Sequence, residues 1–473
     1  MTPFVIVGTL MAGAAIAGLA PARLSANRML VVDGEPTFLI GLYEHPTSDA
    51  RLQEAIAAGF NLIHCPPDPA ALDRVHRLKA RAWVNTGYAL DLSEDTASRK
   101  AALTEMVRKL GSHPALLVWE GPDEALWNCW YGTMEALAPE LQAMRDEAAA
   151  NPRLRGTLEL ALDLYDRALW DRWETVRTQF WAEAGKRTPV PAARMDTAAQ
   201  RATTMGKGFA EGCRFLRSLD PSHFIWLNHA PRNSVRAMRE HNREVDMAGC
   251  DIYPIPGNLR NGHSDLHNTL PSSVGDYTDR MQAAAPGKAC AMVLQGFGWR
   301  DLQQKVTEAE IELGIGRRPT LREQRFMAWN AITHGANAIL YWGTAYLKEP
   351  ESDESRAFWQ DLLTVVREMH GLKRFIAAPD VTPRPRVKVK DHYASNDGTG
   401  VTAMLKKVGD EYRLFVVNEN PYGVEFTISG LPADIGTMKI ERVGNGAVRL
   451  GGGRSISDGI KGYDVHIYQI GPP

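Results

Sequence analysis

Eight short apolar runs, each separated from the next by a helix-forming stretch, constrain the fold of this chain more than any other feature. Near-continuous apolar strands are typical of a parallel sheet that is covered on both faces, and eight strand–helix units close into a barrel. The sequence therefore predicts an α/β protein whose main domain, residues 29–378, is a (β/α)8 TIM barrel. The runs cover residues 38–43, 60–64, 81–85, 115–119, 223–228, 247–253, 290–295 and 336–342.

Each apolar run ends in polar or aromatic residues. In a TIM barrel the carboxyl ends of the strands meet at one face, where active sites are built. Short polar groups there can bind hydroxyl groups, and a tryptophan offers a flat apolar face that suits a sugar ring. The candidate binding residues at these ends are Glu44, His45, Asn85, Trp119, Asn228, Tyr253, Gln295, Trp299 and Trp342.

Two segments depart from this repeating pattern. A helix-forming insertion at about 127–197 separates the fourth and fifth strands, and its apolar residues recur at helical spacing over 154–184. It could cap the pocket, join subunits into a homo-oligomer, or be a structural embellishment. After a proline-rich linker, residues 385–473 alternate short strands with turn signals, which predicts a C-terminal antiparallel β-sandwich domain.

The first 26 residues resemble a secretory signal peptide, because an apolar run rich in Ala and Gly leads into small residues. No Lys or Arg precedes that run, and a lipid-embedded anchor is the alternative, although the run is short for a span. We expect a secreted or periplasmic protein with no membrane span once the signal is removed. The formal net charge of −2 does not indicate a nucleic-acid partner.

The fourth run delivers two carboxyl residues, Asp123 and Glu124, onto a turn. Glycoside cleavage needs a carboxylic acid that protonates the leaving oxygen and a partner that attacks the sugar or activates water. Pro-Asp-Glu is also a common start of a helix, because acidic side chains favour its positive end. At the end of the fourth strand of a barrel, we favour a catalytic role.

The segment His113-Pro-Ala-Leu-Leu-Val-Trp119, with Glu124 five residues later, resembles the fourth-strand signature of the large TIM-barrel clan of retaining β-glycosidases. That clan includes β-galactosidases, β-mannosidases and endoglucanases. The resemblance implies that Glu124 is the acid/base and that Asp123 stands where the clan has Asn. The segments 247–254 and 340–342 resemble the sixth and eighth strands of β-galactosidase relatives.

The seventh run departs from that clan, which places a nucleophilic Glu at its end. Gln295 or Gly296 stands there instead, and an amide cannot form the glycosyl ester of a retaining mechanism. Three explanations stay open. The enzyme could be inverting, with Asp251 or else Glu44 as the base. The substrate could supply an acetamido nucleophile beside Asp123 and Glu124, or catalysis could be lost.

Metal and cofactor chemistry is not indicated, because the His and Cys residues do not show the spacing of a zinc site. The reading that fits these patterns is a glycoside hydrolase acting on an extracellular or periplasmic oligo- or polysaccharide, with Glu124 as general acid. Asp251 and Asp123 are its candidate catalytic partners. The alternatives are a glycan-binding barrel without catalysis and, as a weaker one, a scaffold that uses the helical insertion.

Overall fold

The computed structural model describes residues 20–472, apart from 167–168, 191–194, 232, 256–269, 303–306, 348–351, 391–399, 445, 449 and 453. Residues 1–19 lie outside this range, so the predicted signal peptide and export stay predictions. Among the helices of the described chain, none combines the length and the hydropathy needed to cross a bilayer.

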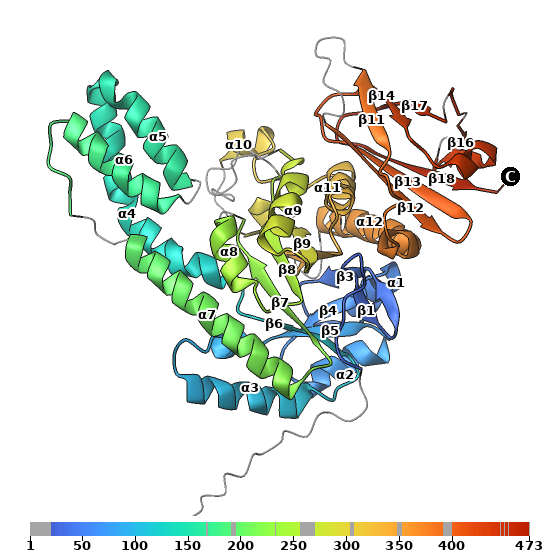
Figure 1. The fold of residues 1–473 in the computed structure, drawn as a ribbon, viewed down its shortest axis with the longest axis horizontal. Coiled ribbons are helices and arrows are strands. Elements are labelled where there is room, and N and C mark those ends of the chain that lie inside the picture. Colours follow the sequence, from blue (N-terminus) through green and yellow to red (C-terminus); the bar gives the residue numbers. More distant parts are fainter. Residues whose placement is uncertain are drawn as a thin grey trace, which may run out of the picture.

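A closed barrel of eight parallel strands forms the centre of the molecule (Figure 1), as the sequence predicts. All eight apolar runs are strands, and each pairs with its neighbours in chain order until the last strand closes on the first. The strands are β3 Leu39–Leu42, β4 Leu62–Cys65, β5 Arg81–Asn85, β6 Leu116–Glu120, β7 Phe224–His229, β8 Met247–Ile252, β9 Ala289–Gln295 and β10 Ala338–Trp342.

Helices cover the outside of the barrel because every second strand residue points outward and is apolar. On β9, for example, Ala291 and Val293 belong to the core inside the barrel, whereas Met292 and Leu294 belong to the core beneath the helices. The covering helices are α1 Asp49–Ala58, α2 Pro69–Arg77, α3 Thr96–Leu110, α7 Met195–Leu219, α8 Val235–His241, α9 Ser273–Ala284, α11 Leu321–Thr333 and α12 Asp353–Ala377.

The barrel is preceded by a hairpin of β1 Leu30–Val32 and β2 Glu35–Thr37, which turns at Asp33-Gly34. Asp33 and Gly34 both have positive φ, which a type I′ turn requires. A short helix, α10 Glu308–Glu312, follows β9 and begins with a capping box at Thr307.

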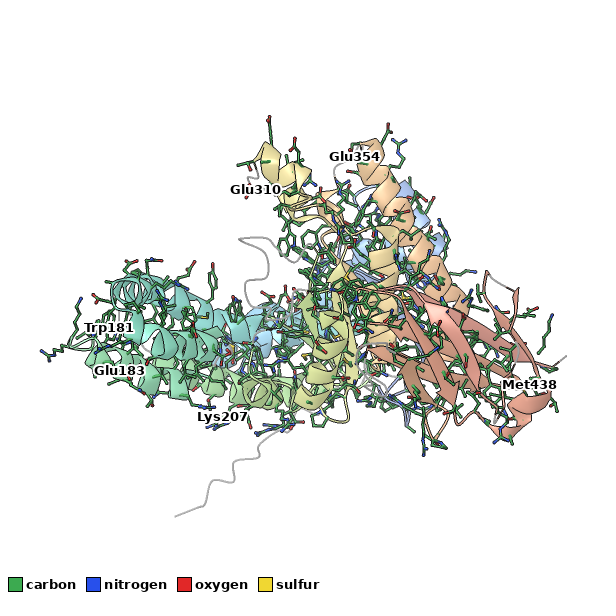
Figure 2. The ribbon with its side chains drawn as sticks, turned by 90° about the horizontal axis from the view of Figure 1, so that it is seen from above. Trp181, Glu183, Lys207, Glu310, Glu354 and Met438 are labelled. Atoms are coloured by element: carbon green, nitrogen blue, oxygen red, sulfur yellow. The ribbon has the colours of Figure 1, made fainter. Side chains whose placement is uncertain are left out.

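The insertion after the fourth strand is helical, as predicted, and projects from the barrel as an arm (Figure 1). It consists of α4 Ala125–Ala150, α5 Arg155–Asp166 and α6 Trp170–Glu183. Tyr165, Trp173 and Phe180 are buried inside the arm, so it has a core of its own. Trp181 and Glu183 lie at the opposite end of the molecule from Met438 of the C-terminal domain (Figure 2).

The C-terminal domain is a β-sandwich, as predicted. The three-stranded sheet has the order β11-β14-β17 and the five-stranded sheet β12-β13-β18-β15-β16, and one apolar core lies between them. Phe415 of β13 stacks on Trp329 of α11, with ring centroids 4.7 Å apart, and joins this domain to the barrel. The strands are β11 Arg386–Lys390, β12 Val401–Val408, β13 Glu411–Asn418, β14 Val424–Ser429, β15 Lys439–Arg442, β16 Gly446–Ala447, β17 Ile456–Ile460 and β18 Val465–Gly471.

Candidate functional site

Strand alternation brings one inward-facing side chain from each barrel strand to the carboxyl end. Residues lower in each strand that belong to the core inside the barrel show which face of the strand points inward. Every second residue from them also points inward, and the last of these lies at the carboxyl end. In chain order these eight residues are Tyr43, His64, Asn85, Glu120, Asn228, Asp251, Gln295 and Trp342. We call this set the upper ring. Five of its members were predicted from the sequence as site residues.

Glu120 is the centre of hydrogen bonding on one side of the upper ring. Its Oε2 accepts from Trp83 Nε1 at 3.1 Å and from Asn85 Nδ2 at 3.0 Å, and its Oε1 accepts from the Tyr43 hydroxyl. Burial and the charge of Asp123 raise the pKa of Glu120 well above its usual value, against the effect of these hydrogen bonds. Glu120 is therefore a buried carboxyl group with an unusual proton affinity.

Asn228 joins two of the predicted catalytic carboxylates. Its Nδ2 donates to Asp251 Oδ1 at 2.6 Å and to Asp123 Oδ1 at 2.9 Å. Its Oδ1 is buried without a hydrogen-bond partner among the described residues. The amide therefore holds Asp123 and Asp251 together, although they come from the fourth and sixth strands.

Asp123 and Glu124 lie in the turn that follows β6. Gly121 donates its N–H to the carbonyl of Trp226 at 2.8 Å, and a Cβ at Gly121 would lie 2.3 Å from Cδ2 of Leu227, so a larger residue would require the Leu227 side chain to move. Glu124 then adopts a left-handed conformation (φ 48°) as the N-cap of α4. This conformation is uncommon for a residue with a side chain and is found preferentially at functional sites.

Carboxylates dominate the electrostatics of the site. Burial and the charges of Asp251, Asp123 and Glu124 raise the pKa of Tyr253 well above its usual value. Asp123 reaches solvent, but desolvation by the surrounding protein still raises its pKa, against the hydrogen bond from Asn228. Acidic groups this close oppose one another's ionisation, which favours a protonated member near neutral pH.

An aromatic group lines the other side of the barrel mouth. Trp342 stacks on Tyr253, with ring centroids 5.5 Å apart and planes at 16°, and Phe297 contacts the edges of both. Trp299 is buried against Phe297 at 5.2 Å. Trp342 is partly exposed, so it can offer a face to a ligand. Trp299 is buried, so its role is to pack against Phe297.

Five predicted binding residues lie outside the upper ring. Two of them, Tyr253 and Trp299, belong to the aromatic group described above, and the other three are Trp119, Glu44 and His45. Trp119 belongs to the core beneath the helices, and its Nε1 donates to Asp220 Oδ2 at 2.8 Å. Glu44 is buried in an ion pair with Arg51 at 3.0 Å, and Arg51 lies over the ring of Trp359. The structure places both residues on the outer face, away from Asp123 and Asp251.

His45 follows the outer residue Glu44. Its Nε2 lies 2.8 Å from an Arg74 guanidinium nitrogen and its Nδ1 lies 3.5 Å from Cys65 Sγ. Burial and the charge of Arg74 lower the pKa of His45, so the structure uses it as a neutral acceptor.

Gln295 occupies the upper ring, but its amide is engaged by the backbone. Oε1 accepts from Ile255 N at 3.0 Å, and Nε2 donates to Ile255 O at 2.6 Å and to Phe297 O at 3.1 Å. The seventh strand thus carries a side chain that fixes the segment after β8. It offers no nucleophile to a substrate.

Tyr43 and Glu120 were not among the residues predicted as site residues. The signal that identifies them is strand parity, because Val118 and Glu120 share the inward face of β6 while Trp119 lies on the other. In a strand buried on both faces the apolar run is continuous, so the sequence does not show which residues point inward.

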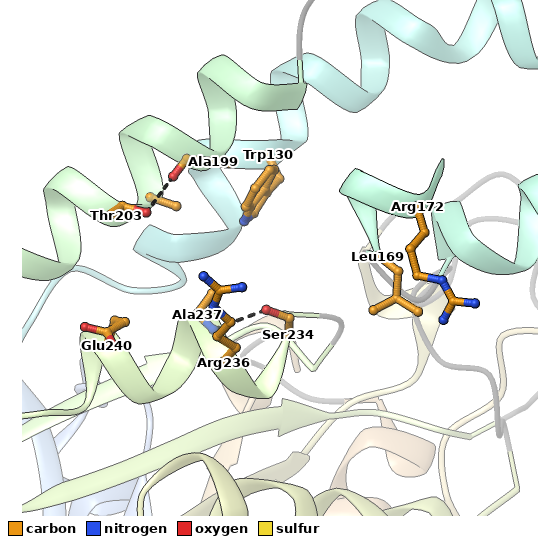
Figure 3. A pocket seen from close by; sticks show the side chains of 10 residues that line it. Trp130, Leu169, Arg172, Ala199, Thr203, Ser234, Arg236, Ala237 and Glu240 are labelled. Atoms are coloured by element: carbon orange, nitrogen blue, oxygen red, sulfur yellow. Dashed lines mark hydrogen bonds between the residues drawn. The ribbon is translucent and has the colours of Figure 1, made fainter. Parts of the chain in front are cut away.

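A cavity of about 490 Å³ lies between the arm and the barrel (Figure 3). It is lined by Trp130 of α4, Thr203 of α7, Arg236 of α8 and neighbouring side chains. None of the site residues predicted from the sequence lines this cavity. It is separate from the upper ring.

The described residues contain no group of three or more His, Cys, Asp or Glu side chains that could hold a metal ion.

Comparison with known proteins identifies the fold through structure alone. No protein-family model matches the chain, and no curated protein matches its sequence. The chain has the fold of TIM-barrel glycoside hydrolases. The GH42 β-galactosidase Gan42B from G. stearothermophilus matches with a TM-score of 0.53 at 11% identity, over 93% of this chain and 99% of that chain.

Two further β-galactosidases show the same likeness. The enzyme from Bacillus circulans sp. alkalophilus has a TM-score of 0.52 at 9% identity, over 93% of this chain and all (100%) of that chain. The enzyme from Rahnella sp. R3 has a TM-score of 0.52 at 10% identity, over 93% and 99%. The likeness covers the barrel and the C-terminal β domain together.

Proposed function

We propose that this protein is a glycoside hydrolase in which Glu124 protonates the leaving oxygen. The observation that carries the proposal is the position of Glu124, which a left-handed turn after the fourth strand brings beside Asp123, Asp251 and Tyr253. A carboxyl group among other carboxylates tends to keep its proton, which a general acid requires. The fold shared with β-galactosidases supports a carbohydrate substrate.

Asp251 and Asp123 are the proposed partners of Glu124. The shared amide of Asn228 fixes both carboxylates close to Tyr253, whose ring stacks on Trp342. Negative charge at this place stabilises the positive charge that develops on the sugar ring in the transition state. Glu44 is not part of this proposal, because its ion pair with Arg51 holds it on the outer face.

The test is hydrolysis of a glycan panel by the wild-type protein and two matched variants. Glu124→Gln should lower kcat on the best substrate by about 10²–10⁴-fold, the usual contribution of a general acid. Glu135→Gln makes the same change at an exposed position of the same helix and should leave kcat unchanged. Wild-type turnover by Glu124→Gln would refute the role of Glu124.

A glycan-binding barrel without catalysis is the second candidate, and the engaged amide of Gln295 favours it. It predicts no turnover on any member of the panel, together with binding that Trp342→Ala weakens. A panel member that the wild-type protein hydrolyses would exclude this candidate.

Export and assembly are separate proposals that rest on the sequence. We propose that residues 1–26 direct export to the periplasm or the exterior, and the mass of the mature protein recovered outside the cytoplasm tests this.

We also propose that the helical arm joins subunits. Light scattering should then give a multimeric mass for the full chain and a monomeric mass when residues 135–190 are replaced by a short linker.

A further inference from the structure

A glycoside hydrolase of this fold needs an attacking group, and the seventh strand lacks one. Gln295 cannot form a glycosyl ester, and its amide is bonded to Ile255 and Phe297. A retaining mechanism requires a nucleophile within reach of the sugar, whereas an inverting mechanism requires a base that activates water. A nucleophile that is held in contact with a base could take the place of the missing glutamate.

Tyr43 at the end of β3 meets this description. Its ring is fixed on three sides, because it stacks on His64 at 5.6 Å and contacts the edges of Trp83 at 5.2 Å and Trp226 at 5.8 Å. Its hydroxyl group donates to Glu120 Oε1, and the residue is partly exposed. Ring packing thus aims the hydroxyl group of a partly exposed residue at a buried carboxylate.

Glu120 has the environment of a base. Trp83 Nε1 and Asn85 Nδ2 can only donate, and both donate to Oε2, so Oε1 is left to receive the proton of Tyr43. The three hydrogen bonds that Glu120 accepts favour its carboxylate form against the burial that raises its pKa, and the carboxylate is the form that can take the proton of Tyr43. Burial and the nearby carboxylates raise the pKa of Tyr43, so its phenol needs such a base to react.

We propose that Tyr43 is the catalytic nucleophile and Glu120 its base, a proposal that rests on the hydrolase function proposed above. As the glycosidic bond breaks, Glu124 gives its proton to the leaving oxygen. The Tyr43 oxygen bonds to the anomeric carbon while its proton passes to Glu120. Water then attacks that carbon and gives a proton to Glu124, and Tyr43 leaves as a phenol with the proton that Glu120 returns.

The two displacements at one carbon give net retention, which separates this proposal from an inverting reaction at Asp251. The charges of Asp123 and Asp251 also act on Tyr43 and contribute to its raised pKa. They are placed to stabilise the sugar cation on either side of the tyrosyl intermediate.

Two measurements on the wild-type protein test the proposal. NMR of fresh product from an active glycan should show the anomer of the substrate. A panel of 2-deoxy-2-fluoroglycosyl fluorides in the gluco, galacto and manno configurations should label the protein, and peptide mapping should place the sugar on Tyr43. An inverted product, or a label on Asp251, Asp123 or any other residue, would overturn the proposal.

Variants supply an independent readout. Tyr43→Phe keeps the ring contacts and should lower kcat by at least about 10³-fold with little change in KM, because only a transition-state bond is lost. Tyr422→Phe removes an exposed hydroxyl group in the C-terminal domain and should behave as wild type. Wild-type kcat in Tyr43→Phe would overturn the proposal.

The label on the wild-type protein decides the matter if Tyr43→Phe does not fold. The same experiments separate failure of this inference from failure of the proposed function. If Glu124→Gln is inactive and the product is inverted, the hydrolase function stands and Tyr43 is not the nucleophile. If no glycan is hydrolysed, both proposals fail.

Discussion

At the scale of single residues, the site depends on one amide that serves two carboxylates. Asn228 is 2% exposed, and its Nδ2 donates to Asp251 and Asp123. Removing the Asn228 amide takes one hydrogen bond from each carboxylate, and a hydrogen bond to a charged group typically contributes about 1.5–3 kcal/mol to stability. The side chain of Asn228 therefore stabilises the protein as well as the arrangement of the site.

Asn228→Asp tests this role. The variant removes both donated hydrogen bonds and adds a third carboxylate, so we expect a lower melting temperature. The loss should be larger at about pH 8 than at about pH 4, because the carboxylates repel one another only when they are ionised. Thermal unfolding at both pH values measures it, with Asn128→Asp at an exposed position as control. An equal loss at both would contradict the account.

Residue types at strand ends were predictable, but their partners were not. The sequence located Asp123, Glu124, Asn228 and Asp251 because each follows or ends an apolar run. It could not show that Asn228 bridges two acids, because that contact joins residues 105 positions apart in the chain. Such contacts depend on how the barrel closes.

At the scale of elements, β6 shows the limit of reading strands from apolar runs. Trp119 and Glu120 are adjacent and both buried, yet Trp119 faces the helices and Glu120 faces the barrel interior. Strand existence and order were predictable from the eight runs, whereas the strand ends differ from the predicted ones by up to two residues. The inward face was not, since a continuous apolar run hides the alternation.

Trp119→Phe separates the two faces of β6. The substitution removes a hydrogen bond to buried Asp220. Burial opposes the ionised form of Asp220, but hydrogen bonds from His223 and Trp119 hold its pKa below the usual value. We expect about 1–3 kcal/mol lower stability in urea unfolding. We expect KM and kcat to stay at wild-type values, because Trp119 does not line the upper ring. A large rise in KM would instead place Trp119 in the substrate site.

At the scale of the whole molecule, a polar cluster fastens the C-terminal domain to the barrel. Glu419 Oε1 accepts from Asn330 Nδ2 at 3.0 Å, from Thr402 at 2.6 Å and from His334 Nε2 at 2.7 Å. His334 Nδ1 lies 3.0 Å from Asp279. Burial opposes charge on His334, but hydrogen bonds to Asp279 and Glu419 outweigh it and raise its pKa to about 9.

His334→Gln should therefore destabilise the protein in a pH-dependent way. Because the pKa of His334 is raised in the folded state, the charged histidine stabilises the folded protein. This stabilisation is complete below about pH 6.5, the pKa of histidine in the unfolded chain. That stabilisation is lost as the pH rises through about 9. We expect a cost of roughly 1–3 kcal/mol at about pH 6 and little at about pH 10, from urea unfolding at both. A cost that does not change with pH would contradict the charged contact.

The arrangement of the three parts was predictable in outline. The helical insertion and the β-sandwich were placed from composition and turn signals, and both are confirmed. The direction in which the arm projects, and the cluster around Glu419, depend on tertiary packing that the sequence does not reveal.

The most direct test of the central claim, that Glu124 is the general acid of a glycoside hydrolase, is the dependence of Glu124→Gln on the leaving group. A dinitrophenolate departs without a proton, whereas an alkoxide does not. We predict that the variant loses about 10²–10⁴-fold in kcat/KM on an alkyl glycoside and less than about tenfold on the dinitrophenyl glycoside of the same sugar. Equal losses on both substrates would contradict the assignment.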